Sequence, residues 1–113
     1  MVLNPFREER PKVKQHKLVR CYLDHLRHLA IAPARIFYAA EVLENYETYL
    51  SQRVYLKEII EAHPLSIQGY IVGMTVRDAS VACLKLHLEV LSDFYDFLIR
   101  QGIMEENPVA VVL

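Results

Sequence analysis

The feature that most constrains the fold is an apolar pattern between Ser80 and Gly102 that repeats at helical spacing on two faces. One stripe consists of Val81, Leu84, Leu88, Leu91, Tyr95 and Leu98, and the other of Leu86, Val90, Phe94 and Phe97. A helix that is apolar on two faces has to be covered from two sides. The pattern therefore predicts a long central helix that follows a turn around Thr75 to Asp78 and is ended by Gly102 at positive φ, with other helices packed around it.

The length and composition suit one helical domain. A chain of 113 residues has the common size of a single domain. Its 53% apolar content argues against disorder, and 3 Gly and 5 Pro are few for the turns of an all-β fold. We therefore predict an all-α fold, an orthogonal bundle of four to five helices over residues 13–113, preceded by a flexible arm over residues 1–12.

Three shorter helices are expected before the central one. Their predicted inward residues are Leu18, Tyr22, Leu26 and Leu29 in a helix over about 13–30; Ile36, Ala39, Leu43, Tyr46 and Leu50 in a helix that begins at Pro33; and Ile67, Tyr70, Ile71 and Met74 in a short helix capped by Ser66. Glu41, Glu44 and Glu47 fall outside the second stripe. Residues 51–63, with Val54 and Leu56, either extend the second helix or form their own, and Pro64 is expected to end that segment.

The sequence predicts a soluble, cytoplasmic protein without a disulfide. No apolar run reaches the roughly 20 residues of a membrane span, and the charged N-terminus has no apolar leader behind it. Cys21 and Cys83 lie in apolar helical patterns without a paired spacing. We interpret both as small buried side chains in a reducing compartment.

No catalytic, cofactor or metal site is predicted. Cys21, His25 and His28 have a ligand-like spacing of four and three, but no fourth ligand is suggested nearby. The chain shows no Ser-His-Asp order, glycine-rich phosphate loop or paired carboxylates. The aromatic side chains lie mostly on helix stripes, which favours core packing over stacking on bases.

Charge is distributed unevenly along the chain. Residues 1–35 carry eight Lys or Arg against three acids, and residues 36–113 carry five against eleven, which gives about +5 and −6. A basic front end can meet a polyanion, and it is also an ordinary means of solubility. Charge by itself leaves nucleic-acid binding open.

The stretch from Ser80 to Val111 resembles the close of the N-terminal core-binding domain of tyrosine recombinases, the phage-integrase family. The shared features are a Ser-started helix, a leucine stripe, an aromatic pair, Phe-Leu, Gly and Asn-Pro, here Ser80, Leu84, Leu88, Leu91, Phe94-Tyr95, Phe97-Leu98, Gly102 and Asn107-Pro108. Similar features precede it, so the resemblance covers roughly residues 15–111. The chain departs from the family at Ala32, Arg35 and Ala39, and has fewer basic side chains near the last helix.

The resemblance implies a SAM-like domain that grips double-stranded DNA. The implied contact residues are Arg35, Arg77, Lys85 and His87, with Lys14 and Lys17 from a second basic stretch over residues 12–20. In the family, a C-terminal catalytic domain of the same protein supplies strand cleavage, and other recombinase protomers complete the assembly. The family's His-x-x-Arg motif is absent here, so the resemblance implies a binding domain that is not an enzyme by itself, with the linker to the catalytic domain expected near Leu113.

A helical protein–protein interaction module is the alternative. A DNA-binding domain should gather Arg35, Arg77, Lys85 and His87 on one concave face, whereas an interaction module should expose an apolar patch.

Overall fold

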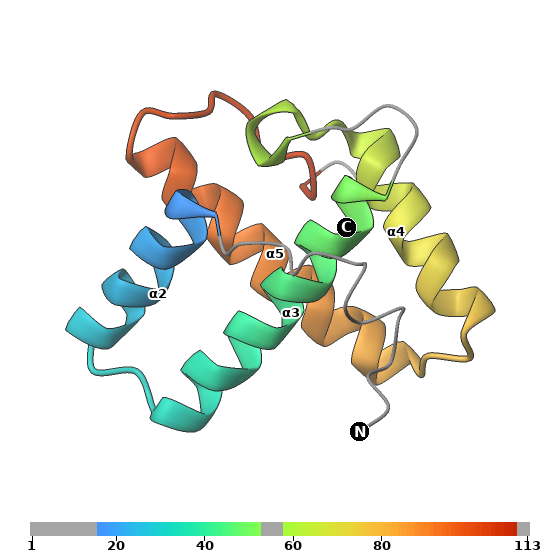
Figure 1. The fold of residues 1–113 in the computed structure, drawn as a ribbon, viewed down its shortest axis with the longest axis horizontal. Coiled ribbons are helices and arrows are strands. Elements are labelled where there is room, and N and C mark those ends of the chain that lie inside the picture. The colour runs from blue at the N-terminus through green and yellow to red at the C-terminus, as the bar shows by residue number, and fades with distance from the viewer. Residues whose placement is uncertain (1–15, 53–57, 111–113) are drawn as a thin grey trace, which may run out of the picture.

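The computed structural model describes residues 16–52 and 58–110, which form an all-α bundle of four α-helices and one short 3-10 helix. The elements are α2 (Lys17–His28), α3 (Pro33–Ser51), η1 (Ile59–Glu61), α4 (Pro64–Val76) and α5 (Val81–Arg100). Helices α3 and α5 cross at the centre, with α2 on one side and α4 on the other (Figure 1). The predicted arm over residues 1–12 lies outside the described residues.

The second half of α5 forms the centre of the core. Leu91, Phe94, Tyr95 and Leu98 are fully buried. In the first half, by contrast, Val81 is 70% and Leu86 48% exposed. The prediction of two covered faces is therefore correct for the second half of α5 and wrong for the first, where Val81 of the first stripe and Leu86 of the second are both exposed.

Helix α3 buries its whole predicted stripe, and α2 buries a shifted one. Pro33 stands in the first turn of α3, as predicted. On α2, Val19 and Leu23 are buried beside Tyr22 and Leu26. Leu29 is 57% exposed, contrary to prediction. Helix α2 ends at His28, so Leu29 is its C-cap residue and not part of the packed helix face.

Three helices end in the same way, with one residue at positive φ. These residues are Ala30 (φ 58°), Asp78 (φ 61°) and Gly102 (φ 74°). In each case the next amide donates to a carbonyl five residues back, as Ile31 N does to Leu26 O at 3.1 Å. This is the Schellman arrangement, which supplies the last carbonyls of a helix with donors. The prediction for Gly102 is confirmed.

The segment before α4 is organised by His63 rather than by Ser66. Helix α3 ends at Ser51, and Val54 and Leu56 lie outside the described residues. His63 is the N-cap of α4, since its Nδ1 accepts from Leu65 N at 3.2 Å, and Ser66 Oγ accepts from His63 N at 3.3 Å. Ser66 is therefore not the cap, and Pro64 begins a helix instead of ending one, because its missing N–H costs nothing in a first turn.

Tyrosine hydroxyls bond α3, α4, α5 and η1 together. The Tyr46 and Tyr95 hydroxyls lie 2.9 Å apart, and Tyr95 Oη donates to Ile59 O at 3.0 Å. Asn45 Nδ2 donates to Tyr70 Oη at 2.9 Å. Throughout residues 16–52 and 58–110, no buried side-chain N or O atom lacks a partner. The predicted core role of the aromatic side chains is confirmed for most of them, with Phe37, 65% exposed, as an exception.

The segment after α5 is held by one buried amide. Asn107 Nδ2 donates to Ser92 O at 3.0 Å and to Asp96 Oδ1 at 3.0 Å. Its Oδ1 accepts from Val109 N at 2.9 Å, and Val109 is fully buried. The Asn-Pro pair thus folds this segment back onto the exposed side of α5.

Glu47 is buried, although its position predicted an exposed side chain. It is 7% exposed, and its Oε1 accepts from His16 N at 3.2 Å, at the start of α2. Burial raises the pKa of the Glu47 carboxyl, partly offset by this bond, and Glu44 adds to the increase. The backbone donor of His16 at the start of α2 explains why a carboxylate is tolerated here.

We expect a Glu47→Gln chain to be at least as stable as the wild-type chain near pH 7. Glutamine keeps an acceptor oxygen for His16 N and removes the charge that burial disfavours. A raised folded-state pKa means that wild-type stability falls as pH rises through 4.5 and beyond, so the two chains should converge near pH 4. Urea unfolding at both pH values measures this, with Glu41→Gln, at an exposed position of the same helix, as control. A Glu47→Gln chain that is clearly less stable than the wild-type chain at both pH 7 and pH 4 would contradict this prediction.

Candidate nucleic-acid interface

The predicted contact residues that the structure describes lie at helix ends or on outer helix faces. Arg35 is in the first turn of α3, Lys85 in the second turn of α5, Arg77 at the C-cap of α4 and Lys17 at the start of α2, all exposed. Lys14 lies outside the described residues, whereas Lys17 and Arg20 of the second basic stretch are described.

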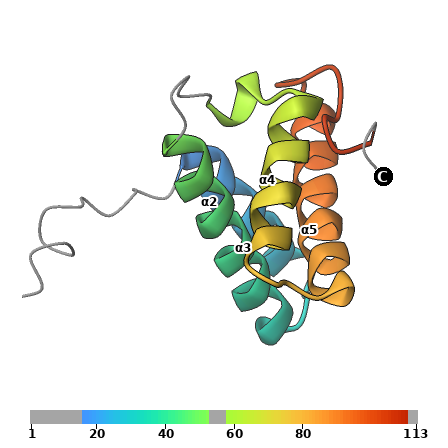
Figure 2. The same cartoon turned by 90° about the vertical axis from the view of Figure 1, so that its right-hand side faces the viewer.

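The N-terminal ends of α3 and α5 lie at the same end of the bundle. Both helices begin at the lower edge in the two perpendicular views of Figures 1 and 2. Neither has an acidic residue in its first turn. The partial positive charge of a helix N-terminus therefore adds to the charges of Arg35 and Lys85 at this end.

Arg35 and Arg100 share one electrostatic environment. Burial and a hydrogen bond to Asp93 raise the pKa of Tyr22, and Arg35 and Arg100 both act to lower it. The two cations thus lie within electrostatic range of one hydroxyl between α2 and α5. Arg100 was not predicted as a site residue, and its only signal in the sequence is a basic side chain in the last turn of a helix.

His87 is engaged inside the bundle, on the α4 side. Its Nδ1 lies 2.9 Å from Tyr70 Oη, and its ring stands edge-on to Tyr38 with 6.3 Å between centroids. Burial lowers the pKa of His87. Burial also raises the pKa of Tyr70, to about 12, and Arg77 acts in the opposite direction on Tyr70. His87 is therefore neutral near pH 7 and bound on the α4 side of the bundle, whereas Arg35 acts on Tyr22 of α2.

Most of the described cations have no carboxylate partner. Within residues 16–52 and 58–110, the ion pairs are Arg27–Asp24 at 2.6 Å and His16–Glu58 at 3.9 Å. The cations left without an ion pair there are Lys17, Arg20, Arg35, Arg77, Lys85 and Arg100. Unpaired exposed cations can contact phosphate without first breaking an internal salt bridge.

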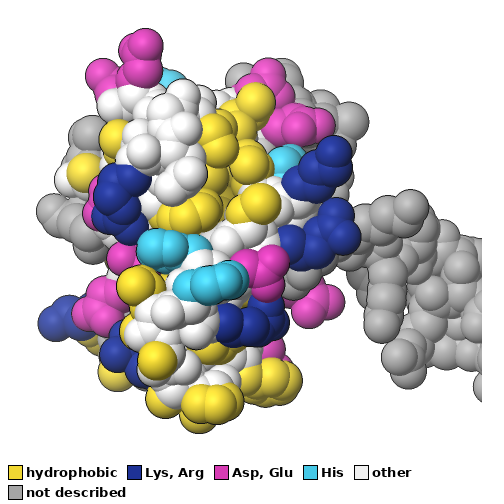
Figure 3. Space-filling view, turned by 90° about the vertical axis from the view of Figure 1, so that its left-hand side faces the viewer, with side chains coloured by type: hydrophobic (Ala, Val, Ile, Leu, Met, Phe, Trp, Pro, Cys, Tyr) yellow, Lys and Arg dark blue, Asp and Glu magenta, His cyan; other side chains and the backbone are white. Residues whose placement is uncertain are grey.

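The α2 side of the molecule carries histidines flanked by basic side chains. Figure 3 shows histidines near the middle of this face, with Lys and Arg at both edges. His25 packs against Phe97 with 5.0 Å between centroids, and His28 Nδ1 bonds to Asp24 O at 2.8 Å. Cys21 is exposed, contrary to prediction, and Cys83 is half-buried, both as free thiols. No group of three or more potential metal ligands occurs in the described part of the chain.

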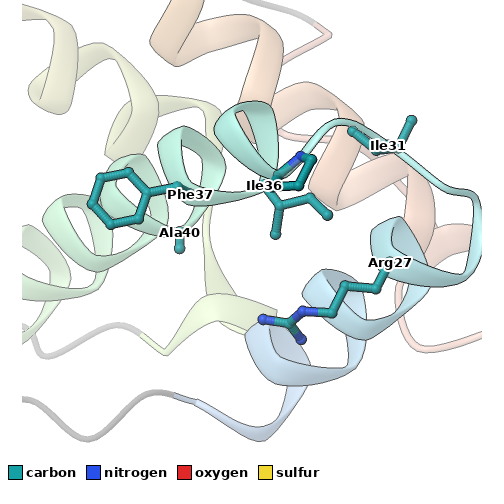
Figure 4. A pocket seen from close by; sticks show the side chains of 6 residues that line it. Arg27, Ile31, Ile36, Phe37 and Ala40 are labelled. Carbon is teal, nitrogen blue, oxygen red and sulfur yellow. The ribbon is translucent and has the colours of Figure 1, made fainter.

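A mostly apolar hollow of about 490 Å³ separates the end of α2 from the first half of α3. It is lined by Arg27, Ile31, Pro33, Ile36, Phe37 and Ala40. Arg27 and Ile36 face it from the two helices (Figure 4). Because Arg27 is already paired with Asp24, the hollow offers mainly apolar contact.

The outer face of α4 is apolar and uncovered by the bundle. Leu65 is 69%, Val72 62% and Val76 77% exposed. The structure therefore has a feature of each candidate function. It has unpaired cations, as a DNA-binding domain needs, although they are spread over more than one face. It also has an exposed apolar patch, as a protein-interaction module needs. No described helix is both long and apolar enough to cross a membrane.

The sequence and structure were compared with known proteins. No family model, curated protein or solved structure matches this chain.

Proposed function

We propose that this domain binds duplex DNA through its backbone phosphates, in the manner of the core-binding domain of a tyrosine recombinase. Strand cleavage and joining would belong to a separate catalytic domain. The observation that carries the proposal is the placement of two acid-free helix N-termini, with Arg35 and Lys85, at one end of the bundle.

The chemistry of this end suits phosphate better than base edges. Amide N–H groups at helix N-termini and long cationic side chains both bind phosphate oxygens. Arg35 and Lys85 are exposed and lack ion pairs within the described ranges, so neither is neutralised internally. Such contacts position a duplex without reading its sequence, and the proposal therefore implies weak binding with little sequence preference.

Fluorescence-anisotropy titration with a duplex of about 30 base pairs tests the proposal. With about four phosphate contacts, affinity should fall roughly 100-fold when salt rises from about 50 to about 200 mM. Lys85→Gln and Arg35→Gln should each weaken binding and reduce the salt slope by about one contact.

Gln52→Glu is the matched control. It lowers the net charge by one, as Lys85→Gln does, but Gln52 is the exposed C-cap of α3, at the other end of that helix. Binding that responds equally to Gln52→Glu and Lys85→Gln would show a dependence on net charge alone. No binding even at low salt would refute the DNA-binding proposal for this chain.

The outer face of α4 favours a second function, binding to another protein. An exposed, uncharged helix face at the edge of a bundle is typical of an interaction surface. This function is compatible with DNA binding, because Arg35 and Lys85 lie on other helices.

A further inference from the structure

Helix α4 is apolar on the side that faces away from the bundle. Its 13 residues, PLSIQGYIVGMTV, include no charged side chain. A helix that is apolar all round is normally covered on every side. Yet α4 lies at the edge of the bundle, and no other helix lies in front of it in Figure 2. Its exposed apolar side chains are therefore available to a partner.

One row on this side, which we call the outer stripe, consists of the exposed Leu65, Val72 and Val76 and the half-buried Gly69, and it is flanked by the exposed polar side chains of Gln68 and Thr75. The stripe residues follow one another at spacings of four, three and four, which places them on one side of the helix. The inner residues Ile67, Tyr70 and Met74 are buried against the bundle on the opposite side.

The spacing of the outer stripe is the same when it is read backwards. Two copies of α4 can therefore pair antiparallel with the stripes in register. Leu65 then faces the partner's Val76, and Gly69 faces the partner's Val72. A valine opposite a glycine fills the space that the missing side chain leaves, so large and small residues alternate across the contact.

The charges at the two ends of α4 favour the same orientation. Glu58 and Glu61 precede the helix, Arg77 follows it, and all three are exposed. In the antiparallel register, Arg77 at the end of one α4 comes to the end of the partner's α4 that η1, with Glu58 and Glu61, precedes. Asp78 comes to the end where His63 lies. A parallel pair would instead bring Glu61 to Glu61 and Arg77 to Arg77.

We propose that the outer stripe of α4 binds the outer stripe of a second copy of this chain, antiparallel about a two-fold axis. A two-fold contact uses the same patch on both copies, and a self-matching row is suited to it. One helix face buries less than a standard interface, so the dissociation constant should fall between about 10 µM and 1 mM. This inference names the partner for the second candidate function and does not depend on DNA binding.

Sedimentation velocity of the full chain without DNA tests the proposal. Between about 5 µM and 1 mM, the sedimentation coefficient should rise from that of a monomer toward that of a dimer. Val72→Asp should weaken the dimer at least about tenfold, because it places two carboxylates at the contact. Leu86→Asp, at an exposed apolar position on α5, should leave dimerisation unchanged. Far-UV circular dichroism confirms that both variants are folded.

A charge exchange tests the orientation independently. Glu61→Arg and Arg77→Glu should each weaken the dimer, and the double variant should recover it, because each arginine again meets a glutamate. A chain that stays monomeric at 1 mM would overturn the proposal. Equal dimer affinity of the Val72→Asp and Leu86→Asp variants would do the same. So would a double variant whose dimer affinity is no higher than that of the two single variants. The Val72→Asp chain should keep the DNA affinity of the wild-type monomer. If the wild-type chain binds DNA but forms no dimer, this inference is rejected and the DNA-binding proposal is not.

Discussion

An Asn107→Asp chain is expected to lose about 2 to 4 kcal/mol in its free energy of unfolding. The substitution keeps the shape of the side chain but replaces the Nδ2 donor by a carboxylate oxygen. That oxygen would meet Ser92 O and Asp96 Oδ1, which both accept from Asn107 at 3.0 Å in the native chain. Two attractive contacts thereby become repulsive. Urea unfolding monitored by circular dichroism measures the loss.

Comparison with Asn107→Ala separates repulsion from loss of contact. Alanine removes the bonds of the Nδ2 donor and also the acceptor of Val109 N, but it adds no charge beside Asp96, so it should be less harmful than aspartate near pH 7. The difference between the two variants should shrink in acid, where the new carboxyl and Asp96 become protonated. An aspartate variant as stable as the wild-type chain would show that this amide does not hold the segment after α5.

A Tyr95→Phe chain is expected to lose about 1 to 3 kcal/mol of stability, because two buried groups each lose a hydrogen bond at once. The Tyr95 hydroxyl donates to Ile59 O at 3.0 Å and lies 2.9 Å from the Tyr46 hydroxyl. Since Tyr95 donates to the carbonyl, Tyr46 donates to Tyr95. Phenylalanine leaves the buried Tyr46 hydroxyl unpaired and leaves Ile59 O with Ala62 N, at 3.3 Å, as its remaining donor. Equilibrium urea unfolding gives the free energy.

A double-mutant cycle with Tyr46→Phe checks the direction of these bonds. Tyr46→Phe should cost less, because the Tyr95 hydroxyl still donates to Ile59 O. In the Tyr95→Phe background, Tyr46→Phe should cost little or even stabilise, because it removes the unpaired hydroxyl. Equal and additive losses for the two single variants would contradict this arrangement.

Local periodicity was enough to predict the helices that pass through the core. The stripe from Ile36 to Leu50 is buried throughout, because α3 has neighbours along its whole length. The same reasoning failed in the first half of α5, where Val81 and Leu86 are exposed. Periodicity shows which faces of a helix are apolar, but the lengths and angles of neighbouring helices decide how far along the helix each face is covered.

The features that the sequence did not predict depend on contacts with distant residues. Glu47 is buried because a backbone amide 31 positions away needs an acceptor. Ala30 and Asp78 adopt positive φ without being glycine, because the turns that follow α2 and α4 require it. Of these turns, only the one at Gly102 carried the usual residue.

The candidate DNA-binding residues were predicted by residue type and position, not by geometry. Arg35 and Lys85 are at one end of the bundle, but His87 is bound to Tyr70, a contact between α4 and α5 that no local pattern reveals. Arg100 and Arg35 both act to lower the pKa of Tyr22, although 65 positions separate them in the sequence. The DNA-binding function itself remains a prediction, which the anisotropy titration tests.

The tyrosine contacts also give the chain an internal optical probe. The chain has 7 Tyr and no Trp, so its near-ultraviolet signal comes chiefly from tyrosine rings. Four of these rings, on α3, α4 and α5, pack against one another: Tyr46, Tyr49, Tyr70 and Tyr95. Near-ultraviolet circular dichroism should therefore report whether α4 is docked on α3, without a label, and can distinguish a folded variant that fails to bind from one that has lost its packing.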